Sequence, residues 1–176
     1  MKLACKPILI LAACLVSPLA QAHDNSLSSG LLAGLAHPLT GLDHLAALIL
    51  SGCLIGRLAT GKSLALVALV GALGAGAAGG ILLGAQAGTE MLVLLSLPVL
   101  LACQWARQPG RLQQAIAVMS LFMVAHGWAH GVEVQGGTAA FVSGFLLMSS
   151  VTLGLSAFIS RYLFMLRAPA NERTHA

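Results

Sequence analysis

Six metal-capable side chains stand in two short polar motifs of a sequence that is otherwise strongly apolar. The first motif runs from His37 to His44 and reads His-Pro-Leu-Thr-Gly-Leu-Asp-His. The second runs from His126 to Glu133 and reads His-Gly-Trp-Ala-His-Gly-Val-Glu. Placing a charged group at the centre of a membrane costs roughly 2.5–3.5 kcal/mol, so such groups are functional candidates by default. The candidate metal ligands are His37, Asp43, His44, His126, His130 and Glu133.

The second motif has the spacing of a helical chelating site. His126 and His130 are four residues apart and Glu133 follows three residues later, so all three share one helical face. A His-x3-His pair can bring both imidazoles to one ion. Imidazoles and carboxylates without thiolates suit Zn, Ni, Co or Fe(II) rather than Cu(I) or an iron–sulfur cluster. We therefore expect a transition-metal site that needs no organic cofactor.

Composition predicts an all-α, polytopic membrane helical bundle. Of the 176 residues, 58% are hydrophobic and 8% are charged, whereas a soluble domain carries about 25% charged residues. Pro38 interrupts the first apolar run, which is either one helix or a short helix followed by a longer one. Such broken helices are common where transporters bind ions. The five expected spans are Leu31–Leu54, Leu64–Gly84, Met91–Ala106, Leu112–His130 and Ala139–Leu163.

The first 22 residues have the features of a cleaved secretory signal peptide, which leaves residues 23–176 as a single transmembrane domain. Lys2 and Lys6 precede an apolar stretch, and residues 20–22 form an Ala-Gln-Ala cleavage site. A lipoprotein cleavage box at residues 11–14 is the alternative. After cleavage, the α-amine and imidazole of His23, with Asp24, are candidates to collect a metal ion; a solvated tail is the other interpretation.

Charge distribution predicts the orientation in the membrane. All seven basic residues of the mature chain fall on one side of the expected spans, and the positive-inside rule assigns that side to the cytoplasm. We expect a multi-pass protein of the bacterial inner membrane with a periplasmic N-terminus and a cytoplasmic C-terminus. Without a basic patch that interleaves aromatic residues, nucleic acid is not an expected partner. The expected partners are a metal ion and the lipid bilayer, and a homo-oligomer is compatible with the sequence.

Helix rise places the two motifs at matching heights. At about 1.5 Å per residue, counted from Arg57 and Arg111, His44 lies about 20 Å and His126 about 22 Å above the cytoplasmic edge. His37 and His130 lie about 30 Å and 28 Å above it. The motifs are therefore expected to form one shared site between the first and fourth spans. In the second span, glycines at four-residue spacing predict a close helix contact: Gly76, Gly80 and Gly84.

Taken together, the two motifs resemble those of the HupE/UreJ family of membrane proteins, over essentially the whole mature chain. The resemblance implies a nickel or cobalt permease, related in role to hydrogenase and urease maturation. It also implies that His37, Asp43 and His44 carry the first metal motif, and the remaining three candidates the second. One departure is Trp128, which is larger than expected between the two histidines and would narrow the site.

The predicted function is secondary transport of Ni²⁺ or Co²⁺ from the periplasm, not catalysis. The chain has no Walker A sequence and hence no ATP motor of its own. Neutral imidazoles bind metals best, so uptake should weaken as the pH falls through the ordinary histidine range near 6.5. Three alternatives stay open: an intramembrane metal-dependent hydrolase with Glu133 as the base, a b-type haem protein with His44 and His126 as axial ligands, and a metal sensor.

Overall fold

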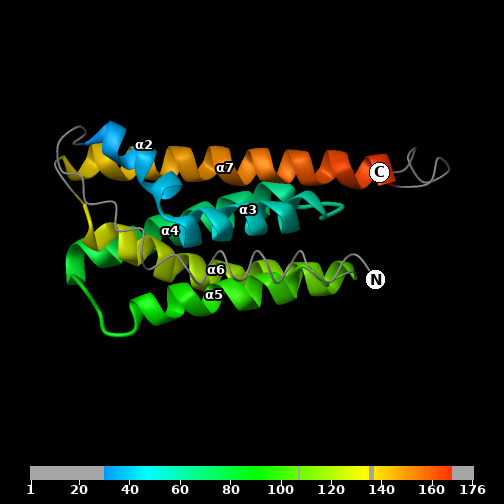
Figure 1. Cartoon of the computed structure of the whole chain (residues 1–176), viewed down its shortest axis with the longest axis horizontal. Coiled ribbons are helices and arrows are strands. Elements are labelled where there is room, and N and C mark those ends of the chain that lie inside the picture. The colour runs from blue at the N-terminus through cyan, green and yellow to red at the C-terminus, as the bar shows by residue number, and fades with distance from the viewer. Residues whose placement is uncertain (1–29, 107, 135–136, 168–176) are drawn as a thin grey trace.

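The computed structural model consists of six helices and describes residues 30–106, 108–134 and 137–167, without a strand among them. The predicted signal peptide, His23 and Asp24 lie outside these residues. The long helices lie side by side with their axes roughly parallel (Figure 1). In chain order the helices are α2 (Leu31–Thr40), α3 (Leu42–Gly56), α4 (Lys62–Leu83), α5 (Thr89–Cys103), α6 (Pro109–Val132) and α7 (Thr138–Arg167).

Length and composition give three to four candidate membrane spans. Helices α4, α6 and α7 are each long and apolar enough to cross a membrane, and α2 with α3 forms a fourth candidate that is bent by 82°. Helix α5 has 15 residues, which at 1.5 Å per residue is about 22 Å, less than the roughly 30 Å of a bilayer core. The all-helical fold is confirmed, while five spans stay a prediction.

The break in the first span comes at Gly41 rather than at Pro38. Pro38 lies buried inside α2, and Gly41 between the two helices has extended backbone angles, φ −86° and ψ 112°. Pro38 has no N–H to donate to the carbonyl one turn earlier, so α2 is weakened just before it ends. The expected break position was therefore wrong by three residues. The bend places Asp43 in the first turn of α3, where the helix dipole favours a carboxylate.

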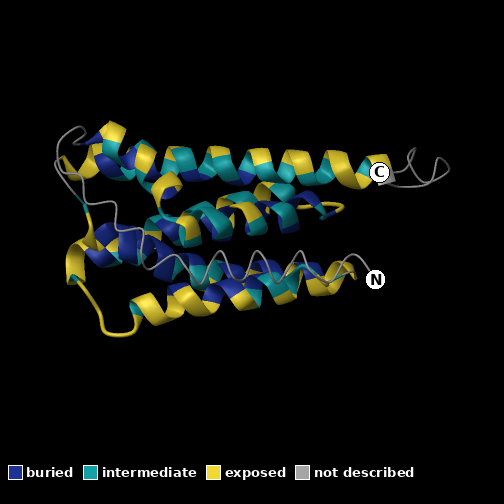
Figure 2. Cartoon of the chain, viewed as in Figure 1, coloured by how far each residue is buried: buried dark blue, intermediate teal, exposed yellow. Residues whose placement is uncertain are grey.

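Helix α6 is the most buried of the three long candidate spans. Within an apolar stretch of 18 residues, 56% of α6 is buried, against 28% for α4 and 22% for α7. The buried faces of the helices turn toward one another (Figure 2). A Cβ on Gly76 would lie 2.0 Å from the Val124 carbonyl oxygen, and one on Gly80 would lie 2.3 Å from that of Trp128. The close contact predicted for these two glycines is confirmed. Gly84 instead ends α4 at a left-handed φ of 70°.

Helix α7 packs closely against both α2 and α3 and runs in the same direction as α3. A Cβ on Gly34 would meet the Phe141 carbonyl oxygen at 2.0 Å, and one on Gly56 would meet that of Ala157 at 2.3 Å. Gly52 lies against Leu153 and Gly56 against Ala157, so the partners advance together along α3 and these two helices are parallel. Helix α2, bent by 82° from α3, instead crosses α7 where Gly34 and Gly144 meet. With no side chain between the backbones, this packing holds the first motif against α7.

Arg57 fastens the loop after α3 to the end of α5. Its guanidinium donates to the Gln104 carbonyl oxygen at 2.9 Å and also to the Ala106 carbonyl oxygen. The Gln104 amide in turn donates to the Leu50 carbonyl oxygen at 3.0 Å. The two bonds of Arg57 satisfy backbone carbonyls just beyond the end of α5. They also bring the loop after α3 and the loop after α5 to the same end of the bundle, as alternating spans require.

Candidate metal centre

The structure brings the six described candidate residues to one end of the bundle. The bent first span supplies His37 from α2 and Asp43 and His44 from α3. The last two turns of α6 supply His126 and His130, and Glu133 follows as the residue that ends this helix. Two groups can be distinguished within this centre, an outer one and an inner one.

The outer group consists of His37, His130 and Glu133, whose ligand atoms all lie within 4.8 Å of one another. His37 Nε2 is 2.9 Å from Glu133 Oε2. The Glu133 side chain is 59% exposed and that of His37 28% exposed, whereas His130 is only 3% exposed. The group is therefore open on its carboxylate side and buried on its His130 side.

The inner group is the pair His44 and His126. Their Nδ1 atoms are 2.9 Å apart, and His126 is 2% exposed. The His130 ring connects both groups, because its centroid lies 4.6 Å from that of His37 and 4.1 Å from that of His44. Four imidazoles thus form a continuous column from the exposed rim into the core.

These separations suit a metal ion better than a haem. Metal–nitrogen bonds of about 2.0–2.1 Å place two neighbouring ligands at right angles about 2.9 Å apart. An ion could therefore replace either the His37–Glu133 or the His44–His126 hydrogen bond with little movement of the side chains. Two axial haem ligands would instead lie about 4.1 Å apart on opposite sides of the iron. The Nδ1 atoms of His44 and His126 are 2.9 Å apart, which is closer than that arrangement requires.

Ser96 of α5 orients His126, a role that sequence reasoning missed. Its hydroxyl donates to the Val93 carbonyl oxygen at 2.6 Å, and its oxygen lies 2.8 Å from His126 Nε2. A serine has only one hydroxyl hydrogen, so the oxygen must accept from Nε2–H. The Nδ1 lone pair of His126 then faces His44. A second partner of this kind fixes the tautomer of a ligating histidine. A single serine in an apolar run is too common to have been singled out.

Carboxylates surround this end of the bundle. Asp43 Oδ1 accepts the backbone N–H of His44 at 2.9 Å, and its Oδ2 lies 4.0 Å from His44 Nε2. Glu90, in the first turn of α5, belongs to the same end: burial, followed by the negative charges of Glu133 and Asp43, raises the pKa of its carboxyl. Glu90 was also missed, because the sequence shows it only as a loop charge. Three carboxylates at one end attract divalent cations.

Trp128 does not narrow the site, contrary to the expectation. Its Nε1 donates to the Gly84 carbonyl oxygen at 2.9 Å, and its ring covers Gly79, where a Cβ would meet it at 2.5 Å. The side chain therefore faces α4 rather than the histidines. It fastens the end of α4 to the helix that carries the second motif.

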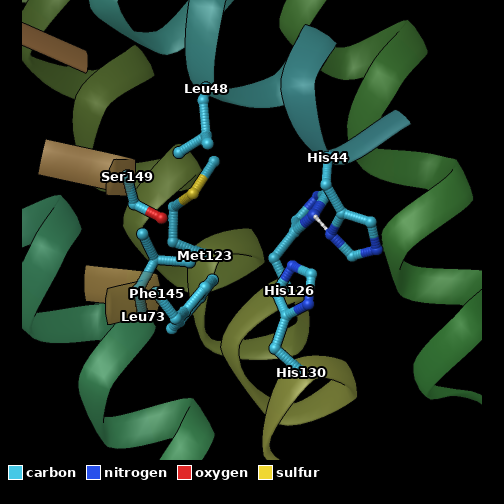
Figure 3. Close-up of a pocket in the computed structure, with 8 residues that line it drawn as sticks. All are labelled: His44, Leu48, Leu73, Met123, His126, His130, Phe145 and Ser149. Atoms are coloured by element: carbon cyan, nitrogen blue, oxygen red, sulfur yellow. Dashed lines mark hydrogen bonds between the residues drawn. The ribbon is translucent and has the colours of Figure 1, made fainter. Parts of the chain in front are cut away.

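A cavity of about 10 Å³ adjoins the inner histidines, close to the room that one water molecule needs. Figure 3 shows His44, His126 and His130 gathered on one side of it and Ser149 on the other. Its lining residues are His44, Leu48, Leu73, Met123, His126, His130, Phe145 and Ser149. The column of imidazoles thus ends on a small space that is part polar and part apolar.

Comparison with known proteins agrees with the motifs. A family profile described as HupE / UreJ protein matches residues 11–175, nearly the full chain. The chain belongs to the HupE/UreJ family. This is a family of membrane proteins related to metal transport, which fits the apolar helices and the histidine and carboxylate cluster of this member. Neither the curated proteins nor the solved structures gave a significant match.

Proposed function

We propose that this HupE/UreJ protein is a secondary transporter that imports Ni²⁺ or Co²⁺ from the periplasm. The observation that carries the proposal is the two-stage donor set. His37, His130 and Glu133 offer ligand atoms within 4.8 Å at an exposed rim, and His44 and His126 continue inward. A resident metal needs only one set of ligands. A second set directly behind the first suits an ion that enters and moves on.

The proposed path begins at the carboxylates. Negative charge at this end raises the local concentration of cations, and the exposed Glu133 is the first ligand to meet the hydrated ion. His37 and His130 then replace water ligands. His23 and Asp24, which lie outside the described residues, are proposed to collect the ion before it reaches Glu133.

Transfer to the inner pair requires only a short step. The His130 ring lies between His37 and His44, so one imidazole can remain a ligand while the others change. Binding must stay moderate at each stage, because a cargo that is held too tightly is not released. Asp43 beside His44 offsets part of the ion's charge in the inner position.

A transport role also accounts for the inner pair, which an intramembrane hydrolase would not need. Zinc hydrolases use three protein ligands and a water at a single ion, and donors behind that ion add nothing to the reaction. We therefore assign no catalytic residue. The orientation that accompanies the proposal is a periplasmic N-terminus and a cytoplasmic C-terminus in the inner membrane, on the basis of the one-sided basic residues.

Accumulation of labelled Ni²⁺ and Co²⁺ by cells that express the protein tests the proposal. His37→Ala and His130→Ala should each abolish accumulation while the amount of membrane-inserted protein is unchanged. Ser120→Ala is the matched control, because the Ser120 hydroxyl bonds within α6, to the Ile116 carbonyl oxygen at 3.0 Å. Normal accumulation in both histidine variants would refute the proposal.

A further inference from the structure

Two serine hydroxyls in the core have no role in the centre described above. Ser149 of α7 and Ser51 of α3 are both 0% exposed, and their hydroxyls have no hydrogen-bond partner among the described residues. Leaving a buried hydroxyl unpaired destabilises a protein. The cost is avoidable in a helix, because other hydroxyls of α7 bond to the carbonyl four residues earlier: Ser143, Ser150 and Thr152.

Ser149 lines the small cavity beside the inner histidines, and its hydroxyl is directed inward (Figure 3). His130 Nδ1 is the other buried polar atom of the lining without a partner in the described part of the chain. Native proteins rarely bury such atoms unless a water or an ion completes them. The cavity is therefore lined by two residues whose buried polar atoms still lack a partner, and a water molecule or a metal ion would supply one.

Ser51 lies further along α3 than the histidines, toward the end of the bundle that carries Arg57. It follows His44 by seven residues, which places it on the same face of α3, about 10 Å further along the helix. Because α7 is parallel to α3 and Gly52 lies against Leu153, Ser149 falls between the histidines and Ser51 in depth. Leu54 and Ile55, 0% and 2% exposed, close this face one turn beyond Ser51.

We propose that Ser149 and Ser51 are successive oxygen ligands on the inner path of a partly hydrated divalent transition-metal ion. This inference rests on the proposed function and extends it beyond the histidines. Hydroxyl oxygens bind such ions more weakly than imidazoles do, so they let the ion leave the inner pair without trapping it again. In this conformation the path is closed by Leu54 and Ile55, so release requires the helices to move.

Accessibility of an introduced thiol tests whether the path is polar. In a background with Cys5, Cys14, Cys53 and Cys103 replaced by alanine, the Ser149→Cys variant should react with Ag⁺, a thiol-reactive cation small enough for the cavity, because only a hydrated thiol forms the reactive thiolate. Ni²⁺ should protect it. The matched control is Ser150→Cys, the adjacent position, whose native hydroxyl is bonded to the Leu146 carbonyl oxygen; it should stay unreactive. A Ser149→Cys variant that accumulates metal but does not react would overturn the inference alone.

Removal of the hydroxyls tests the role in transport. Ser149→Ala and Ser51→Ala should lower the rate of metal accumulation about tenfold, the lower range for a lost supporting ligand, while equilibrium binding at the histidines stays unchanged. Their melting temperatures should not fall, because each change deletes an unpaired group. Accumulation at the wild-type rate, or a lowered melting temperature, would overturn the inference. A wild-type protein that binds metal without accumulating it would refute the proposed function, whereas metal-protected labelling of the Ser149→Cys variant would still support an inner ion position.

Discussion

Replacing Ser96 by alanine should weaken metal binding without touching any metal ligand. The change removes the oxygen that accepts His126 Nε2–H at 2.8 Å, in a place where His126 is 2% exposed and Ser96 0% exposed. An unpaired N–H buried there costs about 1–3 kcal/mol, and the imidazole is free to take the other tautomer. Loss of such an orienting partner typically lowers metal affinity 10–100-fold, or about 1.4–2.7 kcal/mol.

The assay is equilibrium binding of Co²⁺ to the purified protein, followed by its visible absorption, for wild type and three variants. Ser96→Ala should show the 10–100-fold loss. Ser96→Thr keeps the hydroxyl and should retain most of the affinity. Ser120→Ala, which removes a hydroxyl bonded within α6, should bind as wild type does. If Ser96→Ala also bound as wild type does, Ser96 would not orient His126, and the inner pair would not be a metal-binding stage.

Three further predictions concern the fold and the choice of ion. Gly76→Leu should lower the melting temperature in detergent or prevent folding, because its Cβ would lie 2.0 Å from the Val124 carbonyl oxygen and overpacking costs about 1–3 kcal/mol or more. Gly71→Leu should be tolerated, because a Cβ there has nothing within 4 Å, and equal stability of the two variants would contradict the packing described. Arg57→Gln should destabilise the protein by about 1.5–3 kcal/mol, because it loses the bonds to the carbonyl oxygens that follow α5. Lys62→Gln, which loses only a 3.4 Å contact, should not destabilise it, and similar melting curves for the two variants would count against this role of Arg57. In competition binding, a large excess of Mg²⁺ should fail to displace Ni²⁺, because Mg²⁺ prefers oxygen ligands and keeps its water; displacement would argue against imidazole ligation.

Much of the site was predictable because the constant rise of a helix relates the spacing of residues in the sequence to their depth in the bundle. The pairing of His44 with His126, and of His37 with His130, follows from counting residues from two basic residues, Arg57 and Arg111. The structure places each pair in contact. The glycine spacing in α4 likewise predicted its close contact with α6. These predictions depend only on helix rise and periodicity, which hold for any regular helix.

Features that depend on side-chain direction were not predictable in the same way. Nothing in the spacing shows that Trp128 turns to Gly84, or that Ser96 reaches His126 from a helix that the sequence places one span away. The break at Gly41 was missed because a proline can be accommodated inside a helix when the chain bends after it. Such details are set by packing between helices rather than by local sequence.

The most direct test of the central claim is uptake by sealed liposomes that contain only the purified protein and a metal-sensitive dye inside. Wild-type protein should carry Ni²⁺ or Co²⁺ into the vesicles, and His37→Ala and Glu133→Gln should not, while Ser120→Ala should behave as wild type. Equal dye signals from wild type, His37→Ala and protein-free vesicles would contradict transport through the histidine and carboxylate column.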